Sequence, residues 1–302
     1  MEASRATTTT ASAFALGGVR QVLADYVTLT KPKVQLLLLL TTVTTMYVAG
    51  DPSVSLVLLT LLGGSLSAGG AAAVNHYWDR DIDAQMARTA TRPVPSGRIS
   101  PRAALLYGLV LQVLSFVLLA TTVNTLAACL ALSGFLGYVF IYTIWLKRRS
   151  PQNIVIGGAA GAVPPLVGWA AVTGQVDPTA LYLFAIVFYW TPPHFWALSL
   201  LMKDEYARVG IPMMPVVHGE TETRRQILLY TGLLLVLTLL PVVFGFFGIL
   251  YAAAALLLGA GFVSLALRLQ RRADRRSALR TYLFSLAYLA LLFCAMVIDT
   301  RL

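Results

Sequence analysis

Residues 66–83 read LSAGGAAAVNHYWDRDID, an apolar run of small residues that ends in a cluster of polar side chains. The chain has only 13 Asp and Glu in 302 residues, yet Asp79, Asp81 and Asp83 fall within five positions. On a helix, Asn75, Asp79 and Asp83 share one face because they are four residues apart. Asp81 points away from that face. Oxygen ligands in this arrangement suit Mg²⁺, which in such sites usually carries a phosphate. The spacing therefore predicts a metal site, with a solvated acidic helix end as the alternative.

The composition around this stretch indicates an integral membrane protein. Hydrophobic residues make up 58% of the chain and charged residues 12%, about half the charged fraction of an average soluble domain. Runs long enough to cross a bilayer as helices recur along nearly the whole chain. We therefore predict an all-α polytopic protein with nine transmembrane helices around a central cavity open to the cytoplasmic side. The predicted spans are 34–49, 54–76, 103–122, 126–146, 153–172, 179–200, 227–246, 248–267 and 280–298.

The basic residues alternate between the two ends of these spans. Of 23 Lys and Arg, 22 lie in the N-terminal arm or in every second loop, and only Arg301 lies on the other side. The positive-inside rule then places the N-terminus and the polar loops in the cytoplasm and the C-terminus outside a bacterial-type plasma membrane. Residues 1–25 are predicted to be a disordered cytoplasmic arm, and residues 26–302 a single domain. The net charge of +10 reflects topology and contact with membrane lipid, so no nucleic-acid partner is expected.

Two of the cytoplasmic loops, 79–101 and 202–225, are long and polar, and function usually resides in such loops. They are weakly alike, since each has an acidic patch, an Arg and a proline-broken segment. As an acid of the second loop, Asp204 is a further predicted metal ligand, and together with Asn75, Asp79 and Asp83 it could hold one or two Mg²⁺. The cations of these loops and of the fourth span's end are candidates for binding phosphate oxygens, although membrane topology alone also explains a basic pair at a helix end. These candidates are Arg88, Arg92, Lys147, Arg148, Lys203 and Arg208.

The combined groups fit a reaction in which a diphosphate leaves an allylic lipid. A diphosphate leaves readily when its charge is neutralised, and Mg²⁺ with fixed cations does so without proton transfer. The lipid tail then becomes a carbocation, which needs the dry, apolar pocket that a helical bundle offers. The sequence has no P-loop, dinucleotide fingerprint or Ser/His/Asp arrangement. Asn75, Asp79 and Asp83 are therefore the predicted catalytic residues.

The motif Asn75-xxx-Asp79-xxx-Asp83 resembles the first motif of the intramembrane UbiA-type prenyltransferases, and the match is closer to the branch that farnesylates haem. The segments that carry the resemblance are 29–34 (LTKPKV), 75–97 (NHYWDRDIDAQMARTATRPVPSG), 142–174 (YTIWLKRRSPQNIVIGGAAGAVPPLVGWAAVTG), 191–198 (TPPHFWAL) and 203–219 (KDEYARVGIPMMPVVHG). After residue 225 the chain is similar only in hydropathy.

The resemblance implies a nine-helix enzyme that joins the farnesyl group of farnesyl diphosphate to a vinyl group of haem B. Water is added, and haem O and diphosphate are released for haem-copper oxidase biogenesis. The resemblance also implies that the Asn75 motif binds Mg²⁺–diphosphate, that Lys147 and Arg148 contact phosphate, and that His194 belongs to the haem-binding part of the site. A haem A synthase or an oxidase assembly factor is an implied partner.

The sequence departs from the wider family in one place. The family's second Asp-xxx-Asp motif is interrupted here, since the stretch from Asp204 to Arg208 reads DEYAR, and this leaves the number of Mg²⁺ ions open. One alternative function is prenyl transfer to an aromatic quinone precursor, against which the His194 segment and the interrupted motif argue. The other is cation transport through the acidic cluster, although transporters usually place the ion site near the bilayer midplane.

Overall fold

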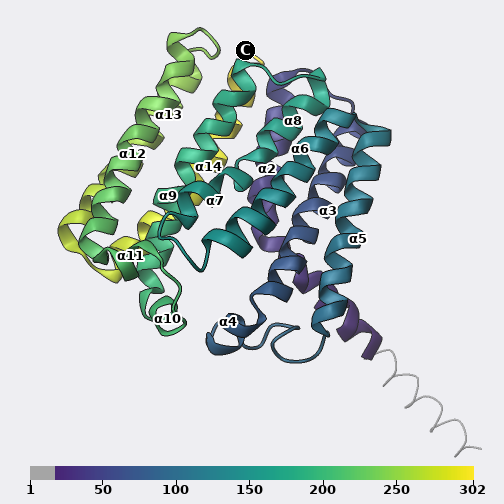
Figure 1. Cartoon of the computed structure of the whole chain (residues 1–302). Helices are drawn as coiled ribbons and strands as arrows, with labels where there is room; N and C mark the ends of the chain where they lie inside the picture. The colour runs from purple at the N-terminus through teal and green to yellow at the C-terminus, as the bar shows by residue number, and fades with distance from the viewer. Residues whose placement is uncertain (1–17) are drawn as a thin grey trace, which may run out of the picture.

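The computed structural model describes residues 18–302, which form an all-helical structure (Figure 1). Helices that follow one another along the chain pack side by side, and the last one returns to pack against α2, so that they close a ring. The long elements are α2 (Pro32–Ala49), α3 (Val54–Trp78), α5 (Pro101–Thr122), α6 (Thr125–Leu136), the π-helix η1 (Gly137–Leu146), α7 (Asn153–Gly161), α8 (Val163–Thr173), α9 (Pro178–Leu201), α12 (Gly219–Val243), α13 (Ile249–Arg272) and α14 (Arg275–Asp299).

Eight segments of the described chain are long and apolar enough to cross a membrane. They confirm the polytopic membrane class and match eight of the nine predicted spans, with α6–η1 and α7–α8 each forming one span. The remaining predicted span, 179–200, falls on α9, a single helix of 24 residues. This helix is not among the eight segments, and Pro192 and Pro193 lie inside it. Nine spans and a central cavity open to the cytoplasm stay predictions.

The two long polar loops fold into short helices. The first contains α4 (Arg80–Gln85), and the second contains α10 (Lys203–Arg208) and α11 (Met214–Val217). Figure 1 shows α4 and α10 at the end of the molecule opposite the C-terminus. Both loops therefore lie at one end of the ring, as the charge pattern predicts.

A helix over residues 18–29 precedes α2. Arg98 Nε donates to both carboxylate oxygens of Asp25, at 2.9 and 3.1 Å, and Leu29 is fully buried. This ion pair and the buried leucine attach the helix to the loop between α4 and α5. Of the arm predicted to be disordered over residues 1–25, the part up to residue 17 lies outside the described residues, and the part from 18 to 25 is helical.

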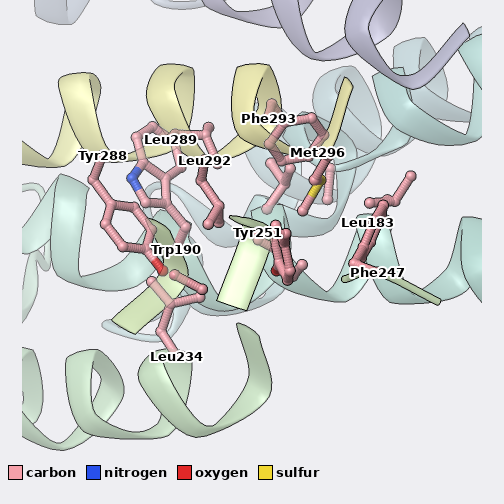
Figure 2. Close-up of a cluster of buried hydrophobic side chains, with 14 of the residues drawn as sticks. Leu183, Trp190, Leu234, Phe247, Tyr251, Tyr288, Leu289, Leu292, Phe293 and Met296 are labelled. Carbon is pink, nitrogen blue, oxygen red and sulfur yellow. The ribbon is translucent and has the colours of Figure 1, made fainter. Parts of the chain in front are cut away.

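A large apolar core joins α9, α12, α13 and α14 (Figure 2). Two of its buried aromatic side chains have their polar atoms hydrogen-bonded to backbone carbonyls. Trp190 Nε1 donates to Ser285 O at 2.8 Å, and Tyr251 Oη donates to Thr238 O at 2.8 Å. The core therefore holds α9 in a fixed orientation between α12 and α14.

The opposite side of the ring depends on a close contact between α3 and α5. A Cβ atom on Gly70 would lie 2.6 Å from Gly108 O, and one on Gly108 would lie 2.7 Å from Gly70 O. Two glycines thus let the backbones touch, which is the usual means of tight packing between membrane helices. This contact fixes the helix that ends at the acidic cluster.

We predict that Gly70→Ala destabilises the protein by about 1–3 kcal/mol, because the new methyl group has no room against a backbone carbonyl. Gly64→Ala is the matched control on α3, since a Cβ there meets nothing within 4 Å and alanine favours a helix. Thermal unfolding of the purified proteins in detergent measures the difference. Equal melting temperatures for the two variants would contradict the packing argument.

Candidate functional site

The acidic cluster forms one buried line at the junction of α3 and α4. The helical register continues through the junction, since Asp79 N donates to Asn75 O at 2.9 Å and Asp83 N donates to Asp79 O at 2.8 Å. Asn75, Asp79 and Asp83 are 3%, 0% and 4% exposed. Asn75 Nδ2 also donates to Asp79 Oδ2 at 2.6 Å. The predicted shared face therefore exists, and it points into protein rather than into solvent.

Fixed cations from two distant parts of the chain pair with the two acids of this line. Lys147 Nζ pairs with Asp79 Oδ2, and Arg92 Nη1 lies 2.7 and 2.9 Å from the two oxygens of Asp83. Two buried carboxylates beside a bilayer would be costly without such partners. Lys147 and Arg92, both predicted as phosphate contacts, thus balance the charge of the two acids in this structure.

The π-helix η1 sets the position of Lys147. Lys147 N donates to the carbonyl of Tyr142, five residues earlier, at 2.8 Å. Gly157 of α7 makes room for this arrangement, because a Cβ atom there would lie 2.5 Å from the ring of Tyr142. Such π segments are frequent at functional sites. The wider turn carries Lys147 to the buried face of Asp79.

Asp81 lies outside the buried line, as the helical spacing predicts. Its side chain is 56% exposed and pairs with Arg148 Nη2 at 2.7 Å. The hydrogen bond from Arg148 lowers the pKa of Asp81 below its usual value. Arg148 also donates to Trp78 O at 2.9 Å and lies 3.5 Å from Asp79 Oδ1, so it links the exposed acid to the buried site.

Two site residues were not among the predicted ones. Lys31 Nζ donates to Asn75 Oδ1 at 2.7 Å, and burial lowers the pKa of Lys31 to about 7. Lys31 precedes Pro32 in a left-handed conformation with φ of 52°, which aims it at a residue 44 positions away. His76, next to Asn75, is 1% exposed, and neither ring nitrogen has a hydrogen-bond partner among the described residues. Both residues lie in segments that carry the family resemblance, 29–34 and 75–97, but neither belongs to the acidic motif.

The buried line has the oxygen ligands that a hard divalent cation requires. Asp79 Oδ1 is buried and makes no hydrogen bond within the described chain, and Asn75 and Asp83 contribute further oxygens. Two carboxylates and one amide suit Mg²⁺, which usually takes one or two protein carboxylates and completes its shell with water or phosphate. No group of three or more His, Cys, Asp or Glu that could hold a metal occurs in residues 18–302. The line thus fits a shared protein–phosphate metal site.

The second polar loop contacts the first mainly through apolar side chains. Tyr206 of α10 packs in one cluster with Ile82 and Met86, and burial raises the pKa of Tyr206. Lys203 Nζ donates to Glu220 Oε1 at 3.0 Å instead of facing the acidic line. The remaining charged residues predicted for the site are exposed and make no side-chain hydrogen bond or ion pair within residues 18–302. These residues are Arg88, Asp204 and Arg208.

His194 occupies an aromatic slot in α9. Its ring stacks between Trp190 and Tyr282, with centroid distances of 4.3 and 4.9 Å. His194 Nδ1 lies 2.6 Å from Ser285 Oγ, and that hydroxyl donates its own hydrogen to Tyr282 O at 2.6 Å. Ser285 Oγ must therefore accept from Nδ1–H, which leaves the lone pair of His194 on Nε2.

Comparison with known sequences identifies related proteins. The sequence profile of the UbiA prenyltransferase family matches residues 38–292. A protoheme IX farnesyltransferase of Roseiflexus sp. (strain RS-1) is 57% identical over 286 residues, 94% of this chain and 54% of the relative. One from Synechocystis sp. is 52% identical over 283 residues, 92% of this chain and 90% of the relative. The chain spans about half the length of the first of these relatives and nearly all of the second.

Solved structures share the fold at low sequence identity. A digeranylgeranylglyceryl phosphate synthase has a TM-score of 0.77 at 18% identity, covering 93% of this chain and all of that one. A UbiA homologue from Archaeoglobus fulgidus, bound to DMAPP and Mg²⁺, has a TM-score of 0.68 at 18% identity, covering 90% of this chain and 99% of that one. This likeness shows that the ring of helices is a UbiA-like fold.

We predict that Asp79→Asn weakens binding of a divalent cation by about tenfold or more, because it removes a charged oxygen from the buried line. Asp81→Asn, which also removes one carboxylate from this region, should bind as the parent does because Asp81 faces outward. Titration with Mn²⁺ in the presence of inorganic diphosphate, followed by electron paramagnetic resonance, measures both. If Asp81→Asn lost cation binding while Asp79→Asn kept it, the cation site would lie on the outward face of the helix, and the assignment to the buried line would be wrong.

Proposed function

The chain belongs to the UbiA prenyltransferase family, and from that membership we propose that it transfers the farnesyl group of farnesyl diphosphate to a vinyl group of haem B. Water is added, and haem O and diphosphate are the products. The support from relatives is identity of 52–57% to proteins named protoheme IX farnesyltransferase. The single structural observation that carries the proposal is the buried Asn75–Asp79–Asp83 line, with Lys147 and Arg92 on it.

In the proposed site, Asn75, Asp79 and Asp83 hold Mg²⁺, and the diphosphate binds against it. When bound, Mg²⁺ neutralises charge on the phosphate oxygens. In the structure several fixed cations pair with these acids. When the diphosphate binds, its oxygens would replace the acids in part of these contacts. Lys147, Arg92 and Arg148 would contact the diphosphate as it leaves, a role suited to fixed charges in a site that excludes water. Lys31 contacts Asn75 Oδ1 in the structure, so it would have to share or release this oxygen when the metal binds.

The proposed reaction begins when the C1–O bond of farnesyl diphosphate breaks and the electron pair leaves with the diphosphate. The π electrons of the vinyl group form the new bond to farnesyl C1. The cation left beside the porphyrin ring then takes up water and loses a proton, so that the product has one hydroxyl group. Nothing is oxidised or reduced in this sequence. The protein has to bind and orient the two substrates and to keep water away from the allylic cation. The apolar interior of the ring of helices suits this task.

The second polar loop would complete the diphosphate site. We propose Arg88, Lys203 and Arg208 as further phosphate contacts and Asp204 as a further metal ligand. Lys203 would have to exchange Glu220 for a phosphate oxygen, because the two are paired in the structure. The apolar contact of Tyr206 with Ile82 and Met86 supports this idea, since it already holds the two loops together.

On the acceptor side, we propose that His194 belongs to the haem site. Ser285 fixes its tautomer and the aromatic rings of Trp190 and Tyr282 fix its orientation, so that Nε2 is the nitrogen available to an acceptor. A histidine that binds a metal commonly donates its other N–H to an oxygen in this way. The same arrangement would also serve to hydrogen-bond a polar group of the porphyrin.

For the membrane topology we propose nine spans in a bacterial-type plasma membrane. They are the eight segments identified above and, in addition, α9. The N-terminus and the diphosphate site would face the cytoplasm and the C-terminus the outside. The distribution of Lys and Arg supports this orientation. Residues 26–302 would act as one domain, and a haem A synthase or an oxidase assembly factor would receive the product.

We predict that cells producing the chain accumulate farnesylated haem, and that Asp79→Asn and Asp83→Asn reduce this product by about two orders of magnitude or more, since each removes charge stabilisation from the leaving group. Haem extraction and mass analysis measure it, with Asp81→Asn as the matched control and membrane levels checked by immunoblot. If the parent chain yields only haem B, the acceptor is another molecule, such as a quinone precursor, or the function is transport.

We predict that Ser285→Ala raises KM for haem by about fivefold, because one hydrogen bond that orients His194 is lost. KM for farnesyl diphosphate should not change, and His194→Ala should show the same selectivity with a larger effect. Ser199→Ala is the control, since Ser199 is a buried serine of α9 whose hydroxyl bonds only to its own helix. A selective rise in KM for farnesyl diphosphate would remove His194 from the acceptor site.

A further inference from the structure

A small cavity with an arginine-rich wall lies where α13 and α14 meet, apart from the acidic line. It has a volume of about 70 Å³ and is lined by Leu265, Arg268, Arg272, Ser277 and Arg280, enough room for roughly five water molecules. Arg275 Nη1 donates to Leu201 O at 3.0 Å, so this turn is attached to the end of α9 beside α10. The cavity is therefore at the same end of the molecule as the two polar loops.

A tight turn brings the three lining arginines together. Helix α13 ends at Arg272, and Ala273 follows in a left-handed conformation with φ of 54°. Asp274 then caps α14, accepting from Ser277 N at 2.6 Å. Because the turn is so short, the last turn of α13 and the first turns of α14 face each other across the cavity.

The positive charge around the cavity exceeds the negative charge that the same turn supplies. No arginine between 268 and 280 takes part in an ion pair within the described residues. Asp274 is the only acid between Leu265 and Ile298, and one of its oxygens is engaged in the cap. Arg268, Arg272 and Arg280 are exposed, and because a guanidinium keeps its proton in a protein, three of them around one cavity attract an anion.

The surroundings indicate which anion this is. The adjoining helix surfaces expose Leu267, Leu279 and Leu283 by 38%, 44% and 53%, as expected of residues that face acyl chains. The cavity lies at the adjoining ends of α13 and α14, which are both long and apolar enough to cross a membrane, and basic pockets in such positions bind anionic lipids. We propose that the cavity binds the phosphate of an anionic phospholipid, with its acyl chains along these leucines. A free phosphate or diphosphate has the same charged group but no apolar tail.

The test uses native mass spectrometry of the purified full-length chain in detergent, titrated with phosphatidylglycerol or phosphatidylcholine. The parent should bind the first phosphatidylglycerol about tenfold more tightly than phosphatidylcholine, and Arg268→Gln/Arg280→Gln should lose about that factor. Arg271→Gln/Arg276→Gln removes the same charge from the same helix ends but does not line the cavity. This control variant should keep most of the preference for phosphatidylglycerol over phosphatidylcholine.

Two results would overturn the proposal. Equal losses in the two double variants would show a diffuse basic surface instead of a site. Displacement of phosphatidylglycerol by millimolar inorganic phosphate or diphosphate would show that the cavity takes a soluble anion. If the glutamine variant does not fold, Arg268→Lys/Arg280→Lys replaces it, and the loss of the forked guanidinium geometry should still weaken lipid binding measurably. None of these readouts depends on farnesyl transfer.

Discussion

The structure depends on pairing buried charge at a membrane boundary. Asp79 is fully buried and meets Lys147 from another helix, and breaking a buried pair by removing one member typically costs about 3–5 kcal/mol. The pairing explains why residues far apart in the chain converge at the end of α3. It also explains how one site can serve two states, since cations that neutralise the carboxylates can instead meet a phosphate that arrives with its metal.

Much of this arrangement follows from local sequence rules. Hydropathy predicts the long helices because each must hide its backbone from lipid, and a four-residue spacing predicts that Asn75, Asp79 and Asp83 form one line because α3 and α4 continue in register. The same spacing predicts that Asp81 lies off this line, and in the structure Asp81 is exposed. The likeness between the two loops has a physical counterpart in the packing of Tyr206 on Ile82, although their charges do not meet in this structure.

The parts that sequence reasoning did not find depend on contacts between distant residues. Lys31 reaches Asn75 across 44 positions. It lies in a segment that carries the family resemblance, but no local rule of spacing pairs it with Asn75. The sequence predicts Lys203 as a phosphate contact, and in the structure Lys203 pairs with Glu220, a residue of the next long helix. The π-helical register of η1 is equally invisible, because it arises from the space that Gly157 leaves for Tyr142.

The π-helix η1 limits which insertions and deletions of residues the protein can tolerate. Each residue added to or removed from an α-helix rotates everything after it by about 100°. The wide turn at Tyr142 already contains one residue more than an α-helical turn, and Lys147 reaches Asp79 because of it. Deleting a single apolar residue from Gly137–Leu146 would leave hydropathy and span length almost unaltered, yet Lys147 would still face its carboxylate only if the wide turn tightened into an α-helical one. The length of this segment, more than the identity of its side chains, is therefore what the site constrains.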